Sequence, residues 1–297
     1  MIVHLNGNLV PAADARLSPF DRGFLFGDGV YEGLRAFDGR VVGLSRHVDR
    51  LREGLDESRI ASDAEQLGGL CSRLLEANGL ADAFIYMQVT RGTPGPGQPV
   101  RTRIPAGPIE PTVFAYCTPQ PPLARFVGAE PATVTASVRP DGRWSRGRLK
   151  SISLLGNVIS AVEASEQGAA DAILVRDGMV AEATAANVLL ARAGHVVTPS
   201  LESVPILAGV TRAILLEACP EIASRAVAEH ELADADEVMI VGTTTMITSV
   251  VTLDGRPVGD GRPGPIARRL LGELVGAIKR DLGMSESERC TRAAASR

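Results

Sequence analysis

The first part of the chain consists of short apolar segments separated by turn residues, a pattern that predicts β-hairpins. Asn6-Gly7-Asn8 marks one turn, and Asp38-Gly39 marks a second. The strands predicted in this part are residues 2–5, 9–10, 30–37, 40–44, 83–90 and 112–118.

Two helices are predicted in the same part from apolar residues at helical spacing. Ser45 is expected to cap the first helix, in which Val48 and Leu51 lie on one face. The second helix is expected over residues 63–77 and to end at the turn that contains Gly79.

The second part of the chain mixes strands and helices. Asp177-Gly178 marks the turn of a hairpin within residues 171–183, and another hairpin is predicted within residues 248–259. Further strands are predicted within residues 131–138, 187–200 and 237–244, and helices over residues 154–167, 211–219 and 265–282.

The stretch from Pro119 to Pro122 is the best candidate for a linker, because prolines hold a chain extended and end regular structure. Residues 92–111 form a second Pro- and Gly-rich stretch, which is long for an unstructured connection and indicates a functional or disordered loop. A chain of 297 residues favours two domains. We expect a small N-terminal α/β domain at 1–118, a linker at 119–125, a larger C-terminal domain at 126–284 and a disordered tail at 285–297.

Composition excludes several classes of protein. A net charge of -4 without a basic run argues against a nucleic-acid partner, and no apolar stretch is long enough to span a membrane. The first residues do not resemble a signal peptide, and the four scattered cysteines suit reduced thiols in the cytoplasm. Neither the cysteines nor the four histidines have the spacing of metal ligands, so we expect no metal site.

Lysine is rare in this chain. Only Lys150 and Lys279 occur, and subtracting these two from the 31 lysines and arginines leaves 29 arginines. Compositional bias explains the excess of arginine but not the two exceptions. Lys279 lies near the end of the predicted last helix, where any cation suits the helix dipole. Lys150 lies among arginines in the predicted C-terminal domain and indicates amine chemistry, because a guanidinium does not lose its proton in proteins.

Three glycine-containing segments resemble phosphate sites to different degrees. Residues 27–33 lack the spacing of a dinucleotide fingerprint and precede a hairpin, so we interpret them as a turn that leads into a strand. Gly209, Val210 and Thr211 open a predicted helix, whose free N–H groups suit a phosphate. Residues 241–246 lie at the end of a predicted strand and contain three threonines beside a glycine. This composition fits a second anion-binding turn or a polar loop.

Two charged residues stand among apolar neighbours. Arg50 lies on the first predicted helix, and Glu182 follows a strand of the hairpin at 171–183. A carboxylate in apolar surroundings is costly unless it is paired. The alternative to a buried, paired position is, for both Arg50 and Glu182, a solvated position on the surface.

The order of these segments matches a known family. DRGFLFGDGVYEG, HVDRL, RLKSISLLGNV, VAEATAANV, ILAGVTR and GTTTMITSV follow one another as in the class IV aminotransferases, and the chain resembles these pyridoxal 5′-phosphate (PLP) enzymes of fold type IV over residues 1–280. The resemblance implies a mixed α/β (α+β) fold of two domains with the cofactor in the cleft between them. It also implies a PLP-dependent transaminase with a ping-pong mechanism.

The resemblance further implies a role for individual residues. Lys150 would bind PLP as a Schiff base and move a proton between the substrate Cα and the cofactor. Glu182 would pair with the ring nitrogen, and Arg50 would bind the phosphate. Other cofactor contacts are expected from Leu207, Val210, Thr211 and Thr243, and substrate contacts from Tyr31 and Thr244.

The residues that would bind the substrate carboxylate depart from both familiar patterns. Branched-chain aminotransferases carry a Tyr where this chain has Leu155 and an Arg where it has Tyr86, whereas LKSISLLGNV and YMQVTRGTP resemble D-amino-acid aminotransferases. The latter use an Arg-x-His pair in the following loop, and residues 92–111 contain no His. The candidate carboxylate ligands are Arg101 and Arg103, for which a solvated position is at least as well supported, and Arg35.

Three hypotheses remain open for the activity. An aminotransferase for D-amino acids, with (R)-amines as conceivable donors, is favoured over a branched-chain L-amino-acid aminotransferase. Aminodeoxychorismate lyase is a further alternative within the family, although the VYEG segment suits transaminases better. A scaffold that binds without catalysis is disfavoured by Lys150, Glu182 and Arg50 together. The resemblance also implies a homodimer.

Overall fold

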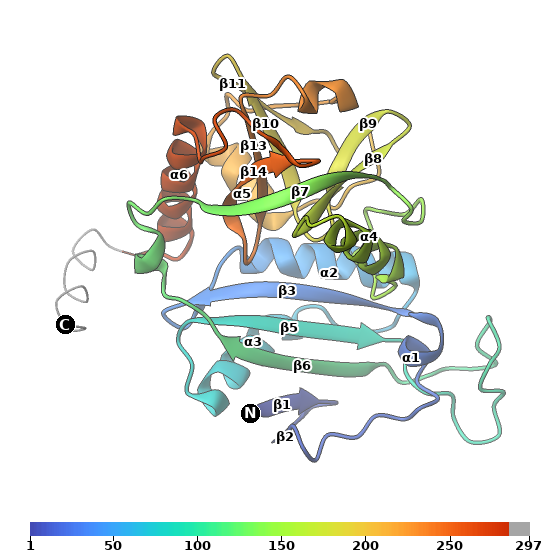
Figure 1. The fold of residues 1–297 in the computed structure, drawn as a ribbon. Coiled ribbons are helices and arrows are strands. Elements are labelled where there is room, and N and C mark those ends of the chain that lie inside the picture. Colours follow the sequence, from blue (N-terminus) through green and yellow to red (C-terminus); the bar gives the residue numbers. More distant parts are fainter. Residues whose placement is uncertain (285–297) are drawn as a thin grey trace. The chain divides into compact units, whose positions relative to one another are not determined.

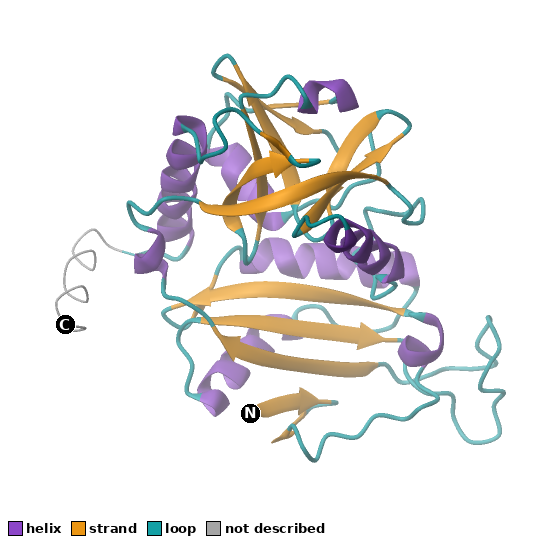
Figure 2. Cartoon of the chain, in the orientation of Figure 1, coloured by secondary structure: helices purple, strands orange, loops and turns teal. Residues whose placement is uncertain are grey.

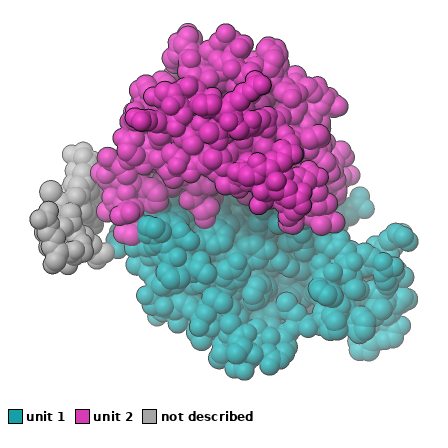
Figure 3. All heavy atoms as spheres, viewed as in Figure 1, with its two compact units in different colours: residues 1–121, 149–154 teal, residues 122–148, 155–297 magenta. Residues whose placement is uncertain are grey.

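The computed structural model describes residues 1–284, which form two compact units (Figure 3). Unit 1 contains residues 1–121 and 149–154, and unit 2 contains residues 122–148 and, among the described residues, 155–284. The tail predicted at 285–297 lies outside the described residues.

The division differs from the predicted domains in one segment. Residues 149–154, with Lys150, belong to unit 1 instead of the C-terminal domain. The cause is backbone pairing with a strand of unit 1, because the N–H of Tyr31 donates to the carbonyl of Lys150 at 3.0 Å and Ser151 forms a bridge with Val30.

Unit 1 contains an antiparallel six-stranded sheet in the order β2-β1-β6-β5-β3-β4 (Figure 1). Both predicted hairpins are confirmed: β1 pairs with β2, β3 pairs with β4, and Asn6 and Asp38 take the positive φ values that such turns require. The strands are β1 (Ile2–Leu5), β2 (Asn8–Pro11), β3 (Gly29–Phe37), β4 (Arg40–Val41), β5 (Ala83–Thr90) and β6 (Thr112–Pro119).

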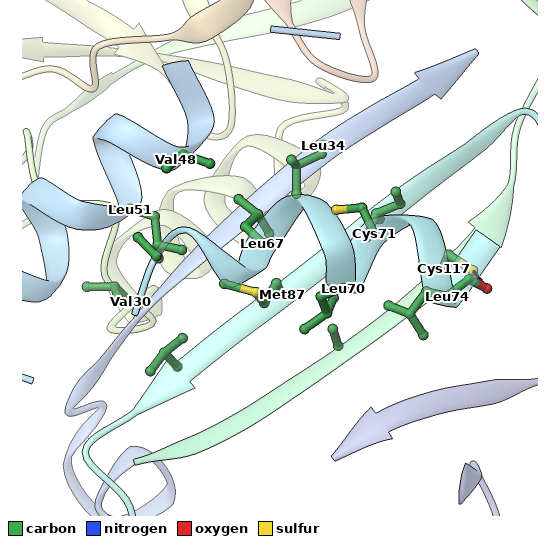
Figure 4. Close-up of a cluster of buried hydrophobic side chains, with 14 of the residues drawn as sticks. Val30, Leu34, Val48, Leu51, Leu67, Leu70, Cys71, Leu74, Met87 and Cys117 are labelled. Atoms are coloured by element: carbon green, nitrogen blue, oxygen red, sulfur yellow. Dashed lines mark hydrogen bonds between the residues drawn. The ribbon is translucent and has the colours of Figure 1, made fainter. Parts of the chain in front are cut away.

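Two helices, α2 (Leu44–Ser58) and α3 (Gln66–Asn78), cover one face of this sheet (Figures 1 and 4). Alternate residues of the strands face the helices, because successive side chains of a strand point to opposite faces. Leu51 of α2 and Leu74 of α3 are buried against Leu34 and Met87, and a fully buried leucine contributes about 2 kcal/mol to folding.

The helix boundaries differ from the prediction in two places. The N-cap of α2 is Gly43 with φ 58°, so the predicted cap Ser45 lies within the first turn and makes no capping bond. The chain enters the helix in a left-handed conformation, which glycine adopts without strain. The short helix α1 (Arg22–Phe26) was not predicted, since five residues are too few to show a helical period.

Unit 2 contains a nine-stranded mixed sheet in the order β12-β11-β10-β13-β14-β7-β8-β9, with β15 paired to β14. The hairpin of β8 and β9 turns at Asp177 and Gly178 as predicted. The strands are β7 (Ala132–Pro140), β8 (Asp171–Arg176), β9 (Met179–Ala183), β10 (Asn187–Arg192), β11 (His195–Pro199), β12 (Ala223–Arg225), β13 (Glu237–Gly242), β14 (Met246–Leu253) and β15 (Arg256–Pro257).

The helices predicted in the second part of the chain are present with small shifts at their ends (Figure 2). Apolar side chains of unit 2 form two buried clusters, and Ile173 of β8 and Val188 of β10 belong to one, whereas Ala164 and Leu174 belong to the other. The helices are α4 (Leu155–Glu166), α5 (Val210–Ala218) and α6 (Pro265–Asp281), with 3-10 turns η1 (Leu123–Phe126) and η2 (Glu229–Leu232).

Two general properties bear on function. Among the helices of residues 1–284, none combines the length and the apolar character needed to cross a lipid bilayer. Over the same residues, His, Cys, Asp and Glu side chains form no group of three or more that could hold a metal ion.

Candidate active site

Strand β3 presents candidate residues on both faces of the unit 1 sheet. Val30, Glu32 and Leu34 share the face covered by α2 and α3, and Tyr31 lies on the opposite face, since side chains alternate along a strand. The same alternation therefore separates a buried carboxylate from a more accessible tyrosine one residue away.

The amine of Lys150 lies beside Tyr31. Lys150 Nζ is 4.2 Å from the centre of the Tyr31 ring, and the Lys150 side chain is only partly buried. Tyr31 stacks on Tyr86 with ring centres 5.5 Å apart, and Tyr86 stacks on Tyr116 at 5.3 Å. These are the three tyrosines of the whole chain, and all of them form one row on the face of the sheet opposite α2 and α3.

The opposite face holds Glu32, whose side chain is fully buried. Arg50 Nε donates to Glu32 Oε1 at 2.8 Å, and Arg50 Nη2 donates to Oε2 at 2.6 Å. The ring of His47 contacts Oε2 through Nδ1 at 2.7 Å. Burial alone would raise the pKa of Glu32, but Arg50 and then His47 lower it to about 2. Arg50 is thus held in a fixed plane by a bidentate ion pair.

In unit 2, Glu182 is a second buried carboxylate, at 5% exposure. Its Oε2 accepts hydrogen bonds of 3.1 Å from Asn187 Nδ2 and from the backbone N–H of Leu207. Its Oε1 accepts from Nη1 of Arg143. Arg143 is therefore the partner that this carboxylate was expected to need.

Arg143 is itself held by a third buried carboxylate. Asp141 accepts from Arg143 Nε at 2.8 Å and from Nη2 at 2.9 Å, and Arg176 also contacts Asp141 at 3.1 Å. Although burial raises the pKa of Asp141, the hydrogen bonds from Arg143 lower it below its ordinary value. Charges therefore alternate in sign from Arg176 through Asp141 and Arg143 to Glu182.

Asn187 connects Glu182 to the segment that leads into α5. Asn187 Nδ2 donates to the Leu207 carbonyl at 3.0 Å, and a Cβ on Gly209 would come within 2.0 Å of Asn187 Oδ1. Gly209 is the N-cap of α5, and no side chain caps this helix. The first N–H groups of a helix have no partner within it, so Val210 and Thr211 begin a site that suits an anion.

The predicted second anion-binding turn joins β13 to β14. Thr243 is half-buried and Thr244 is exposed, whereas the Oγ1 of Thr245 is buried and has no hydrogen-bond partner. Thr245 was not predicted as a site residue. A buried hydroxyl without a partner is uncommon and marks this turn as a place where a polar ligand fits.

The three arginines considered for a substrate carboxylate lie in different surroundings. Arg101 and Arg103 are exposed on the loop of residues 92–111, and Arg101 lies over the Phe26 ring at 5.9 Å. Arg35 is buried, donates to Gln120 Oε1 and the Pro121 carbonyl, and stacks on Phe37. Burial lowers the pKa of Arg35 to about 10. These contacts explain the position of Arg35 without a substrate.

The structure brings some of the predicted residues into contact within each unit. Lys150 meets Tyr31 in unit 1, and Glu182 meets Leu207 and the start of α5 in unit 2. The roles of four partners were not predicted from the sequence: Asp141, Arg143, Asn187 and Glu32. The one signal in the sequence was the apolar setting of Glu182, which required a partner but did not identify it.

Each unit contains groups whose chemistry fits a part of PLP. A phosphate suits the start of α5, where no side chain caps the helix, and a ring-nitrogen proton suits a carboxylate held as Glu182 is. An accessible amine is available at Lys150. The orphaned hydroxyl of Thr245 adds a polar group in the second turn.

Comparison with known proteins shows the family to which the chain belongs. The family model "Amino-transferase class IV" matches residues 29–253. D-alanine aminotransferase of Bacillus licheniformis is 36% identical over 285 residues, which cover 94% of this chain and 97% of that protein. A putative branched-chain-amino-acid aminotransferase of Methanocaldococcus jannaschii is 34% identical over 277 residues, with 91% and 94% covered.

Solved structures show the same fold. The branched-chain amino acid aminotransferase of Escherichia coli matches with a TM-score of 0.84 at 23% identity, covering 96% of this chain and 97% of that chain. A hypothetical aminotransferase from Mycobacterium tuberculosis in its PLP-bound form matches with a TM-score of 0.77 at 25% identity, covering 95% and 100%. The predicted mixed α/β fold of type IV is confirmed.

We predict that Glu32→Gln destabilises the protein without cofactor by about 3 kcal/mol at pH 7, because the partly buried Arg50 loses its anionic partner. The pKa of Glu32 is lowered on folding from 4.5 to about 2, so its contribution is complete above pH 4.5 and is lost as the pH falls toward 2. Urea unfolding at pH 8, 5.5, 4 and 3 measures the difference from the unmodified protein.

The difference should be equal at pH 8 and 5.5 and should shrink below about pH 4.5. Glu53→Gln, an exposed position on the same helix, is the matched control and should change stability little at any pH. A difference that stays constant down to pH 3 would show that Glu32 is not the ionised partner of Arg50.

Proposed function

Since this chain belongs to the class IV aminotransferases and is a PLP-dependent transaminase, we propose that its amino donors are D-amino acids and that 2-oxo acids collect the amine. The observation that carries this proposal is the similarity to D-alanine aminotransferase along 94% of the chain. The segments around Lys150 and Arg91, which resemble D-amino-acid aminotransferases, support it.

Lys150 is the residue that we assign to the reacting centre. Its Nζ would hold the cofactor and would move the proton at the substrate Cα. Bound PLP supplies the electron sink that stabilises the negative charge left on Cα. Tyr31 lies against this amine at 4.2 Å and limits the directions in which Nζ can move, so we assign it to the wall of the substrate pocket.

Glu182 is assigned to the proton on the ring nitrogen of the cofactor. The ion pair with Arg143 stabilises Glu182 as a carboxylate, and Asp141 balances the charge of Arg143. A carboxylate there keeps the proton on the ring nitrogen and so strengthens the electron sink. The hydrogen bonds from Asn187 and Leu207 fix the direction in which this carboxylate points.

The phosphate is assigned to the start of α5, at Val210 and Thr211, with Arg50 and Thr243 as further ligands. The N–H groups and dipole of the uncapped helix favour an anion. Glu32 holds the guanidinium plane of Arg50, which supports its assignment as an oriented cation. Leu207 is assigned to the face of the cofactor ring, and its half-buried side chain adjoins the Glu182 network.

The substrate carboxylate is assigned to Arg101 and Arg103, with Thr244 as a neighbour that offers backbone N–H. Both arginines are exposed, and they stand two residues apart on one loop. Arg35 is the weaker candidate because its guanidinium already binds Gln120 and Pro121. A guanidinium pairs with a carboxylate through two parallel hydrogen bonds, which suits recognition of an amino acid.

A branched-chain L-amino-acid aminotransferase is the second candidate. The relative from Methanocaldococcus jannaschii, 34% identical over 277 residues, favours it. We also propose that the enzyme works in the cytoplasm, where its thiols stay reduced. The buried free thiols of Cys71, Cys117 and Cys219 support this location.

We predict that D-alanine converts the bound cofactor to its amine form and that a 2-oxo acid reverses the change, both read by cofactor absorbance. L-leucine, L-valine and (R)-1-phenylethylamine complete the panel of donors, and each is compared at the same concentration. Faster conversion by the L-amino acids would overturn the D-amino-acid proposal in favour of the second candidate. Lys150→Ala is the control and should show no turnover with any donor, because it lacks the reacting amine.

We predict that Glu182→Gln retains the cofactor but lowers kcat roughly 100-fold, because an amide does not hold the ring-nitrogen proton. Arg143→Met should lower kcat roughly tenfold and weaken PLP binding to the apoenzyme, since Glu182 loses its cationic partner. Arg192→Met, at an exposed arginine that also pairs with an aspartate, is the matched control. Near-normal kcat in Glu182→Gln would exclude the ring-nitrogen role.

We propose that the enzyme is a homodimer and that α4 contributes to the interface. Leu155, Val158, Ile159 and Val162 recur at helical spacing on one face of α4 and are 71%, 53%, 47% and 51% exposed. A contiguous exposed apolar stripe of this kind is typical of a surface that another protein covers. The family resemblance supports a second copy of this chain as that protein.

We predict that Val158→Asp shifts the protein from dimer to monomer, as measured by sedimentation equilibrium, because a charge on the covered face has to be desolvated. Val127→Asp is the matched control, since Val127 is also 53% exposed but lies outside α4. A monomeric unmodified protein would contradict the dimer, and an unchanged dimer in Val158→Asp would exclude α4 from the interface.

A further inference from the structure

The loop of residues 92–111 contains no helix or strand, yet both of its ends are held by one carboxylate. Asp21 accepts hydrogen bonds from Thr90 Oγ1 at 3.0 Å and from Thr112 Oγ1 at 2.7 Å, and these threonines end β5 and begin β6. Asp21 also caps α1 by accepting from the N–H of Gly23. The carboxylate is buried, so the base of the loop is closed around it.

The backbone closes the same base. The N–H of Arg22 donates to the Gly92 carbonyl at 2.9 Å. Gly92 has a φ of 95°, and a Cβ at this position would come within 1.9 Å of the Glu110 carbonyl oxygen. The two ends of the loop are therefore in van der Waals contact, which requires glycine here.

The middle of the loop is held by the next residue of the chain, Arg22, which is 3% exposed. Arg22 Nη1 donates to the Thr102 carbonyl at 2.6 Å, and Arg22 Nη2 donates to the Arg103 carbonyl at 3.0 Å. These bonds join residues about 80 positions apart in the sequence. A loop of this length loses much conformational entropy on ordering, so such contacts decide whether it is ordered.

Arg22 is oriented in turn by an acidic partner. Its Nε donates to Asp28 Oδ2 at 2.8 Å, and Asp28 also accepts two hydrogen bonds from Arg91, which directly precedes the loop. Burial raises the pKa of Asp28, but the hydrogen bonds from Arg91 and Arg22 lower it below its ordinary value. The Phe26 ring lies 4.8 Å from the Arg22 guanidinium and 5.9 Å from that of Arg101.

The held carbonyls belong to the tripeptide Arg101-Thr102-Arg103, which carries the two proposed carboxylate ligands. We propose that Arg22 is a positioning residue for substrate recognition, which clamps the middle of this loop so that Arg101 and Arg103 are presented in a fixed place. The inference rests on the proposed role of these two arginines. Prior ordering of binding groups strengthens binding because less freedom is lost when the substrate arrives.

The clamp has a direct readout, since trypsin cleaves after arginine and Arg101 and Arg103 are exposed. In the holoenzyme, Arg22→Met should increase the initial rate of cleavage after Arg101 and Arg103 about tenfold, because a loop without its two charged hydrogen bonds opens more often. The same variant should raise KM for the amino donor about tenfold while kcat changes less than threefold. Arg22→Lys retains one charged donor and should lie between Arg22→Met and the unmodified enzyme in both measurements.

Arg52→Met is the matched control, because Arg52 is an exposed arginine of unit 1 that pairs with Asp49 and Glu65 outside the clamp. It should change neither cleavage nor KM. If Arg22→Met does not fold, Phe26→Ala removes the ring beneath Arg22 and Arg101 and should raise both quantities in the same direction.

The outcomes separate the clamp from the function on which it rests. If a folded Arg22→Met enzyme shows unchanged cleavage and an unchanged KM, the clamp proposal is overturned. This holds even if the double variant Arg101→Ala, Arg103→Ala raises KM, a result that would support the carboxylate site alone. A second outcome also overturns the proposal: cleavage is faster in Arg22→Met, but KM is unchanged both in Arg22→Met and in the double variant. This result would show that Arg22 clamps the loop and that the loop does not recognise the substrate. Faster cleavage with a raised KM confirms the proposal.

Discussion

Several carboxylates that are wholly or largely buried are paired with arginines, and these ion pairs organise each unit of the protein. Glu32 is held by Arg50, Glu182 by Arg143, Asp141 by Arg143 and Arg176, and Asp28 by Arg22 and Arg91. In each case the cation is an arginine, whose planar fork forms two hydrogen bonds and stays charged. Compositional bias accounts for the excess of arginine in the chain as a whole. At these buried positions a permanent cation is also of use, whereas the role assigned to Lys150 needs an amine.

These ion pairs also connect elements that are distant in sequence. Arg143 and Glu182 are 39 residues apart, and Arg22 reaches a carbonyl 80 residues away. Removing either partner of such a pair leaves the other charge buried without compensation, which costs several kcal/mol. The pairs therefore fix the relative positions of strands, loops and helix ends within each unit. They do so more precisely than apolar contacts, because apolar contacts are not directional.

Local features of the sequence were sufficient to predict much of the fold. The hairpins at Asn6, Asp38 and Asp177 follow from turn residues that take a positive φ, and α6 follows from its apolar period. Features that depend on distant partners were not predictable in this way. The left-handed cap at Gly43 depends on how the chain leaves β4, and α1 is too short for periodicity to show.

In the candidate site, too, local features were predictable from the sequence and distant partners were not. Lys150 and Glu182 could be singled out from the sequence, one by lysine scarcity and the other by a carboxylate in an apolar run, whereas Arg143 and Asn187 could not, because nothing in their own segments requires a distant partner. The placement of Lys150 in unit 1 likewise depends on backbone pairing with β3, which side-chain patterns do not report.

The groups assigned to the cofactor and those assigned to the substrate are held by different kinds of contact. Lys150 is positioned by strand pairing and Glu182 by buried hydrogen bonds, so neither depends on residues 92–111. Arg101 and Arg103 lie on that loop, where the sequence can change while the strands and the buried pairs remain. The relatives of this chain are named for D-alanine and for branched-chain amino acids. Such a division is consistent with that range, because the proposed carboxylate ligands lie on a segment anchored separately from the groups assigned to the cofactor.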